Sequence, residues 1–245
     1  MTPALHAPAG ELPSTAGLRA PRQAVLRAGR PVAHGLLRAW YDLELHGTDR
    51  MPTSGPVVMA ANHVGWLDGP MLAICSPRPV HALTKLEMFS GPMGGFLLAA
   101  GQIPLDRWHV DLRAIRTAVR ALEAGQVVGV FPEGARGPGD MSSPRAGAGY
   151  LALVSGAPVV PVSFLGTRMP GGADGSVPPR GSRIAMTFGE PVHLPAQPWP
   201  RTQDDVARAA ARVTAAILQT IHEAEEATGL SLPGPLGPTR GKKRA

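Results

Sequence analysis

Apolar and polar residues alternate along this chain in two rhythms, one typical of β-strands and one of α-helices. Short apolar runs such as 56–61 and 127–131 have the length and β-branched content of buried strands. Longer segments such as 110–124 repeat their apolar residues with a helical period. The same criteria predict strands at 41–46, 56–61, 80–84, 102–105, 127–131, 159–165 and 183–188, and helices at 69–75, 85–100, 110–124, 145–155 and 202–227. This alternation predicts one α/β domain, a mixed β-sheet flanked by helices.

The two ends of the chain depart from this pattern. Residues 1–16 are rich in Pro and Ala, and we expect them to be disordered; 229–245 is predicted to be a basic disordered tail. Between the first tail and the domain at 42–228, the segment 17–41 is predicted to form one or two amphipathic helices, with Pro31 as a break or a first-turn residue.

The predicted N-terminal helical segment carries an apolar side and a basic side. A helical projection places Leu18, Val25, Ala28, Val32 and Leu36 together, and Arg19, Arg27, Arg30 and Arg38 opposite. A basic amphipathic helix of this kind lies in a lipid interface. The pattern equally fits a helix packed on the domain with its arginines in water, and both arrangements can hold at once.

The net charge of +6 is concentrated at the ends. Residues 17–40 contain five Arg and no acid, and 229–245 contain four basic residues and no acid, whereas 41–230 are close to neutral. Basic ends attract anionic lipid surfaces or nucleic acid, or are simply solvated. Aromatic residues make up only 4% of the chain, which argues against a protein that stacks bases.

Neither a signal peptide nor a membrane-spanning stretch is predicted, so we expect a protein inside the cell that meets membranes only at their surface. Cys75 is the single cysteine, which excludes an intrachain disulfide. It follows an apolar run without an activating neighbour, and we interpret it as a small core residue.

The most informative residues are His63 and Asp68, which follow the predicted strand at 56–61 on a loop containing Gly65. Catalytic groups in α/β proteins commonly lie where strands end. A carboxylate bonded to one imidazole nitrogen fixes the tautomer and leaves the other nitrogen to accept a proton. The alternative is a solvated His and an Asp that caps the following helix.

Three further clusters stand where predicted strands end. Arg107 follows a short strand and suits anion binding, or else pairs with Asp106 or Asp111. Glu133 and Arg136 follow the strand at 127–131 on a loop whose Gly134 and Gly137 let backbone approach a ligand, although the two charged side chains could simply pair. The third cluster, the apolar strand residues 160–164, could line a pocket but is interpreted as core.

Several common sites are excluded by their missing motifs. The chain has no Gly-x-Ser-x-Gly elbow, no Walker A sequence and no Gly-x-Gly-x-x-Gly after a strand. Its eight His are scattered, so we expect neither a bound metal nor another cofactor.

In order, these clusters resemble the four motifs of the 1-acylglycerol-3-phosphate acyltransferase family, within the glycerolipid acyltransferases. Residues 62–68 match Asn-His-x4-Asp. Residues 101–107 resemble Gly-x-Ile-Phe-Ile-x-Arg with Pro104 at the Phe position, and 131–137 resemble Phe-Pro-Glu-Gly-Thr-Arg-Ser with Ala135 and Gly137 for Thr and Ser. Val-Pro-Val at 160–162 resembles the fourth motif. The resemblance spans about 43–194 and implies the fold and chemistry of that family.

The resemblance implies transfer of a fatty acyl group from a thioester, on coenzyme A or acyl carrier protein, to a lipid hydroxyl. His63 is then the general base and Asp68 its orienting partner. Arg107 and Arg136 would clamp the acceptor's phosphate, and Lys85, after the strand at 80–84, would add charge.

The remaining parts of the implied site are less sharply placed. Glu133 and Gly134 would shape the acceptor site, with Glu133 bonding a glycerol hydroxyl. Backbone groups near Gly65 are our candidates for stabilising the tetrahedral oxyanion. The apolar segment 88–100 would cover an acyl channel, or else form a plain core helix, and Ala135 and Pro104 would alter the choice of acceptor.

The sequence thus predicts an enzyme peripheral to the cytoplasmic side of the membrane that acylates lysophosphatidate to phosphatidate. Its predicted partners are the membrane surface, the lysophospholipid acceptor and the acyl donor, and not nucleic acid. Two alternatives stay open: an acyltransferase for another lysophospholipid or a glycolipid hydroxyl, and a basic lipid- or nucleic-acid-binding protein without catalysis.

Overall fold

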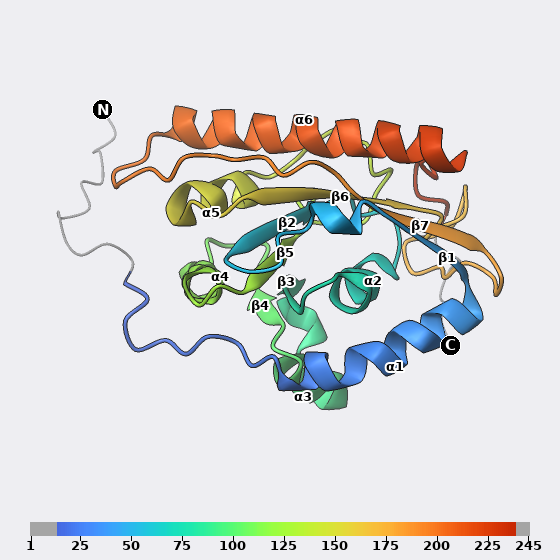
Figure 1. Ribbon diagram of the computed structural model, residues 1–245, viewed down its shortest axis with the longest axis horizontal. Coiled ribbons are helices and arrows are strands. Elements are labelled where there is room, and N and C mark those ends of the chain that lie inside the picture. Colours follow the sequence, from blue (N-terminus) through green and yellow to red (C-terminus); the bar gives the residue numbers. More distant parts are fainter. Residues whose placement is uncertain (1–13, 239–245) are drawn as a thin grey trace.

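The computed structural model describes residues 14–238, which form a twisted seven-stranded sheet between two layers of helices (Figure 1). The strands are β1 (Asp42–His46), β2 (Val57–Ala61), β3 (Val80–Lys85), β4 (Ile103–Leu105), β5 (Val127–Val130), β6 (Val159–Leu165) and β7 (Arg183–Phe188), in the spatial order β1-β7-β6-β2-β5-β3-β4. The five strands from β6 to β4 run parallel, and β7 is antiparallel to β6. The predicted mixed sheet flanked by helices is therefore confirmed.

Helices α4 (Leu112–Glu123), α5 (Gly147–Ser155) and α6 (Gln203–Thr228) cover one face of the sheet, and α1 (Ala24–Trp40) and α2 (Asp68–Cys75) cover the other. The short α3 (Gly91–Ala99) lies near the β4 edge, and single turns of 3₁₀ helix occupy Thr48–Arg50 and Leu86–Met88. None of the helices in the described part of the chain is long and apolar enough to cross a membrane.

Strand β2 shows how the period of two builds both halves of the core. Val58 and Ala60 pack toward α4, α5 and α6, whereas Val57 and Met59 pack toward α2, and all four are fully buried. On neighbouring β5, a Cβ at Gly129 would come within 2.7 Å of Leu72 on α2. The glycine therefore allows α2 to pack closely against the sheet beneath the loop that carries His63.

Local sequence signals correctly predicted where helix α6 begins. The Thr202 hydroxyl accepts a hydrogen bond from the Asp205 N–H at 3.1 Å, and the Asp205 carboxylate accepts one from the Thr202 N–H at 3.2 Å. This is the predicted capping box at the start of α6.

Helix α1 differs from its prediction in both extent and orientation. It begins at Ala24, so Leu18 and Arg19 precede it, and it runs without interruption through Pro31. The buried contact is Leu26, while Val32 and Leu36 are 67% and 66% exposed. The predicted apolar side thus faces outward, because a second apolar row that includes Leu26 and Leu37 contacts the domain.

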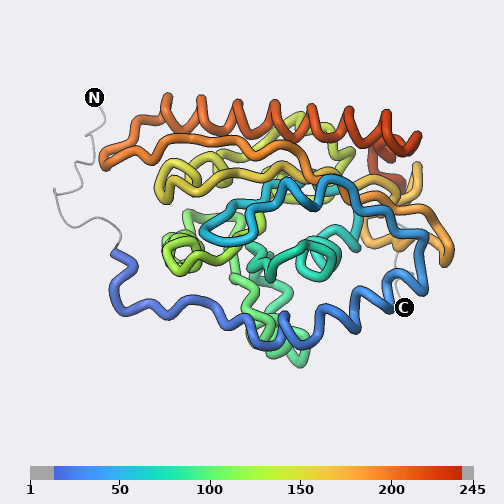
Figure 2. Tube along the Cα trace, viewed as in Figure 1, coloured from blue at the N-terminus to red at the C-terminus, as the bar shows by residue number. Residues whose placement is uncertain are grey.

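The structure contradicts part of the prediction of disordered ends. Residues 1–13 and 239–245 lie outside the described part of the chain. From Gly229 to Pro238, however, the chain leaves α6 and packs on the domain (Figure 2): the Leu232 N–H donates to Glu225 Oε1 at 3.0 Å, and Pro233 is buried. At the other end, the Thr15 hydroxyl contacts Glu123 of α4 at 2.8 Å. The contact of Thr15 joins residues 108 apart and has no local sequence signal.

Candidate active site

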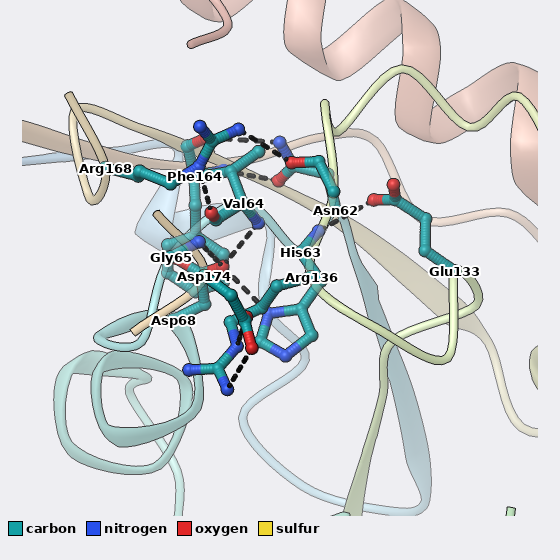
Figure 3. Close-up of polar contacts among 11 residues, drawn as sticks. Asn62, His63, Val64, Gly65, Asp68, Glu133, Arg136, Phe164, Arg168 and Asp174 are labelled. Carbon is teal, nitrogen blue, oxygen red and sulfur yellow. Dashed lines mark hydrogen bonds and ion pairs between the residues drawn. The ribbon is translucent and has the colours of Figure 1, made fainter. Parts of the chain in front are cut away.

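His63 and Asp68 are hydrogen-bonded where β2 meets α2 (Figure 3). His63 Nδ1 lies 2.9 Å from Asp68 Oδ2, and because a carboxylate oxygen accepts, Nδ1 is the donor. The imidazole side chain is 20% exposed, while that of Asp68 is fully buried. This arrangement leaves Nε2 as the nitrogen that can take a proton, as the sequence predicted.

The carboxylate of Asp68 is held by the loop that it closes. The same oxygen, Oδ2, accepts the backbone N–H groups of Val64 and Gly65 at 2.7 and 2.8 Å. Asp68 therefore caps the loop and orients His63 at the same time. Since these two amides are already bonded, they are not the free oxyanion donors that we expected near Gly65.

Two residues that the sequence left without a role fix the His63 loop. The Phe131 ring stacks on the imidazole, with centroids 4.2 Å apart and planes inclined by 23°. Asn62 is fully buried, accepts the Phe164 N–H at 2.7 Å and donates to the Phe164 carbonyl at 3.1 Å, which ties the end of β2 to β6. Their positions in the first and third motifs were the available signal.

Glu133 contacts the backbone of the catalytic loop rather than Arg136. Its Oε1 accepts the His63 N–H at 2.8 Å, because β2 and β5 are neighbouring parallel strands and end side by side. Burial raises the pKa of Glu133 above its ordinary value, and the hydrogen bond from His63 opposes that shift. The bond to a glycerol hydroxyl stays a prediction, and the proposed Glu133–Arg136 pair is wrong.

Arg136 lies in the loop after β5, whose backbone is hydrogen-bonded to that of His63. The Gly137 N–H donates to the His63 carbonyl at 2.9 Å, so the two backbones are adjacent. The Arg136 guanidinium is occupied by Asp174 from the loop after β6: Nε lies 2.6 Å from Oδ1 and Nη2 lies 3.4 Å from Oδ2 (Figure 3). Asp174 is 54% exposed, which makes it an exchangeable partner.

Arg107 joins the second motif to the third. Its Nη1 donates to the Gly134 carbonyl at 2.9 Å, and its Nη2 lies 3.4 Å from Glu87, so it pairs with neither Asp106 nor Asp111. Gly134 adopts φ +68°, and a Cβ there would approach Arg145 Nε to 2.8 Å. This glycine is therefore required both by the turn and by the packing of an arginine.

Two further basic residues, Arg145 and Lys85, lie near Arg107. Arg145 donates from Nη1 to the Arg107 carbonyl at 2.9 Å, a contact that the sequence did not predict. Lys85 is half-buried at the end of β3, where it pairs in register with Leu105 of β4 two residues before Arg107. The predicted basic side chains thus lie at the ends of neighbouring strands.

Other parts of the chain offer less chemistry. Burial raises the pKa of the Cys75 thiol to about 12, consistent with a core residue. Within residues 14–238, no group of three His, Cys, Asp or Glu side chains is arranged to hold a metal ion. A hollow of about 430 Å³ beside α4 and α5 is lined by Ile115, Tyr150 and other residues, none of which belongs to the predicted site.

Comparison with known proteins identifies the class that this fold and site define. The sequence model of the family described as Acyltransferase matches residues 42–165. The chain belongs to this acyltransferase family. The resemblance that the four motifs carried is thereby confirmed.

Individual relatives agree with this assignment. A 1-acyl-sn-glycerol-3-phosphate acyltransferase of Bacillus subtilis is 29% identical over 153 residues, which cover 62% of this chain and 74% of that protein. A chloroplastic enzyme of the same description from Arabidopsis thaliana is 28% identical, with 63% of this chain matching 44% of its length. The chain thus spans less than half of some of its relatives.

A solved structure supports the fold independently. The crystal structure of the 1-acyl-sn-glycerophosphate acyltransferase PlsC from Thermotoga maritima superposes with a TM-score of 0.63 at 24% identity. The likeness covers 82% of this chain and 80% of that one. The mixed sheet with helices on both faces is therefore a fold already seen in a protein of this kind.

Proposed function

We propose that this protein transfers a fatty acyl group from an acyl thioester to the free hydroxyl of lysophosphatidate, giving phosphatidate. The observation that carries the proposal is the 2.9 Å hydrogen bond from His63 Nδ1 to the buried Asp68, which leaves Nε2 as a base on a braced loop. The names of the relatives from Bacillus subtilis and Arabidopsis thaliana support lysophosphatidate as the acceptor.

The proposed reaction needs one proton carrier. His63 Nε2 takes the proton of the acceptor hydroxyl as its oxygen attacks the thioester carbonyl, and the buried Asp68 stabilises the imidazolium. Collapse of the tetrahedral intermediate breaks the carbon–sulfur bond, and the imidazolium returns the proton to the departing thiolate. No acyl-enzyme is required. The donor, acyl coenzyme A or acyl carrier protein, is part of this proposal without a choice between them.

We assign the acceptor's phosphate to Arg136 and Arg107, with Lys85 as a further charge. In the structure, an exposed carboxylate occupies Arg136, and a phosphate has the same bidentate geometry with more charge. Phosphate would therefore replace Asp174 on this guanidinium. Holding the headgroup there would position the acceptor hydroxyl near His63, a contribution that can reach several kcal/mol.

We also propose that the protein works at the cytoplasmic surface of a membrane. Val32 and Leu36 on α1 face outward, and so do Phe96 and Leu98 on α3, which are 59% and 57% exposed. Arg27 and Arg38 are exposed on the same helix, away from its apolar stripe. Exposed apolar side chains with cations on the same element are suited to a lipid interface, and they favour this partner over nucleic acid.

The decisive test is thioester consumption with lysophosphatidate by wild type and His63→Ala. We expect His63→Ala to lose about 10²- to 10⁴-fold in turnover with the fold retained by circular dichroism. The same assay with other lysophospholipids and glycolipids would identify a different acceptor. Equal rates for wild type and His63→Ala would instead favour a binding protein without catalysis.

A further inference from the structure

Arg168, just after β6, is the most completely hydrogen-bonded cation in the described structure and has no role in the proposed chemistry. Its side chain is among the largest fully buried ones, with the residue 1% exposed. A guanidinium has five N–H donors. Nε donates to the carbonyl of Val64, Nη1 to those of Gly172 and Pro235, and Nη2 to those of Gly137 and Gly234, at 2.6 to 3.2 Å.

The five carbonyls belong to four separate segments of the chain. Val64 lies in the His63–Asp68 loop, and Gly137 follows Arg136 in the third motif. Gly172 lies in the loop that carries Asp174, and Gly234 and Pro235 belong to the segment after α6. One side chain thus ties the catalytic loop, the phosphate-binding loop and the C-terminal segment together. Figure 3 shows Arg168 beside Val64 of the catalytic loop.

The contact with Val64 reaches the catalytic base through a single peptide group. The carbonyl of the peptide between Val64 and Gly65 accepts from Arg168 at 2.7 Å, and the N–H of the same peptide donates to Asp68 at 2.8 Å. Asp68 in turn accepts from His63 Nδ1. Hydrogen bonds in such a chain polarise and strengthen one another. The cation therefore acts, through this one peptide group, on the same carboxylate oxygen of Asp68 that accepts the hydrogen bond from the imidazole.

Burial of this cation needs compensation. Desolvation lowers the pKa of Arg168, and the charges of Asp68 and Asp174 act in the opposite direction. Carbonyl groups satisfy every donor, so the guanidinium shape matters as much as its charge. Lysine has three donors on a single nitrogen and cannot serve five carbonyls in a plane.

We propose that Arg168 is a positioning residue that holds Asp68, and through it the His63 imidazole, in the reactive orientation, with the segment Pro233–Pro238 as the outer support of that guanidinium. The proposal rests on the function proposed above and assigns a role to residues outside the four motifs. The C-terminal segment is then part of the active-site framework. It supplies two of the five acceptors.

The first test is Arg168→Lys in the full chain, which keeps the positive charge but loses the planar set of five N–H donors. We expect kcat to fall about tenfold or more with the circular dichroism spectrum retained. A second readout needs no substrate: NMR of ¹⁵N-histidine protein, with the His63 signal assigned by its loss in His63→Ala. The His63 Nδ1 proton should exchange with water about tenfold faster in Arg168→Lys. Unchanged kcat and unchanged exchange would overturn the proposal.

A matched pair of glycine variants tests the C-terminal support, including the case in which Arg168→Lys does not fold. Gly234 and Gly229 both have left-handed φ, 70° and 68°, and open space around a Cβ. Gly234→Val and Gly229→Val therefore carry similar backbone strain, but only Gly234 presents its carbonyl to Arg168. We expect faster exchange of the His63 Nδ1 proton and lower kcat only in Gly234→Val.

These outcomes separate the two proposals. Equal effects of Gly234→Val and Gly229→Val would refute the role of the C-terminal segment. If wild type and His63→Ala turn over lysophosphatidate at equal rates, the proposed function fails. The exchange experiment still decides whether Arg168 orients His63.

Discussion

The two halves of the candidate site are held in opposite ways. The partner of His63 is fully buried, and its Oδ2 accepts three hydrogen bonds, whereas the acidic partners of Arg136 and Arg107, Asp174 and Glu87, are each 54% exposed. A buried, hydrogen-bonded pair is costly to break, and an exposed ion pair is worth about 0–1 kcal/mol. The difference teaches that the base is preorganised, while the anion-binding side chains are held by partners that a ligand can replace.

The largest expected effect comes from breaking the buried side. Asp68→Asn removes the charge that stabilises the imidazolium and can present an N–H to His63, which favours the wrong tautomer. We expect kcat to fall about 10²-fold or more while the protein stays folded. Steady-state kinetics beside a thermal melt would measure both. A kcat within a few-fold of wild type would show that Asp68 only holds the backbone of the loop.

Among the arginines with exposed acidic partners, Arg136→Ala should weaken acceptor binding more than it slows acyl transfer. Loss of a charge-assisted contact raises the KM for lysophosphatidate by about 10- to 100-fold. An acceptor without phosphate should be affected little, and Arg136→Lys should restore part of the loss. Equal losses with both acceptors would rule out the phosphate clamp.

A smaller effect of opposite sign is expected from Asp174→Asn. Release of Arg136 from this exposed carboxylate should lower the KM for a phosphorylated acceptor by at most about fivefold, without changing kcat. Asp49→Asn, a substitution of another exposed acid outside the site, is the matched control. A raised KM in Asp174→Asn would mean that Asp174 orients Arg136 for its ligand.

The smallest effect concerns stability. Burial raises the pKa of Glu133 above 4.5 in the folded state, so the folded protein holds this proton more tightly than the unfolded chain does. Its contribution to the free energy of unfolding is therefore present at low pH and lost as pH rises through the raised pKa. Glu133→Gln keeps an acceptor for the His63 N–H and lacks this titration.

Urea unfolding of both proteins at a series of pH values measures this difference. Relative to Glu133→Gln, the wild type should lose stability as pH rises above about 4.5. A difference in the free energy of unfolding that stays constant with pH would show that folding does not raise the pKa of Glu133.

Features that depend on residues close in sequence could be predicted, whereas contacts between distant residues could not. The capping box of α6 and the ends of β2 and β5 were predictable because they depend on residues close in sequence. The pairing of Arg136 with Asp174, 38 residues away, was not, because many acids lie at comparable separations. Helix α1 illustrates the intermediate case: its helical period was correct, but two apolar rows competed to face the domain.

By itself, the sequence determined the alternating strands and helices, the four motifs in order and the His63–Asp68 pair, since each is encoded over a few neighbouring residues. Only the tertiary structure decided which loops share the edge where β2 and β5 end, and that the chain after α6 returns there to meet Arg168. The physical reason is that a guanidinium satisfied by five backbone carbonyls depends on where three distant segments pass its own loop, and backbone carbonyls are present at every residue.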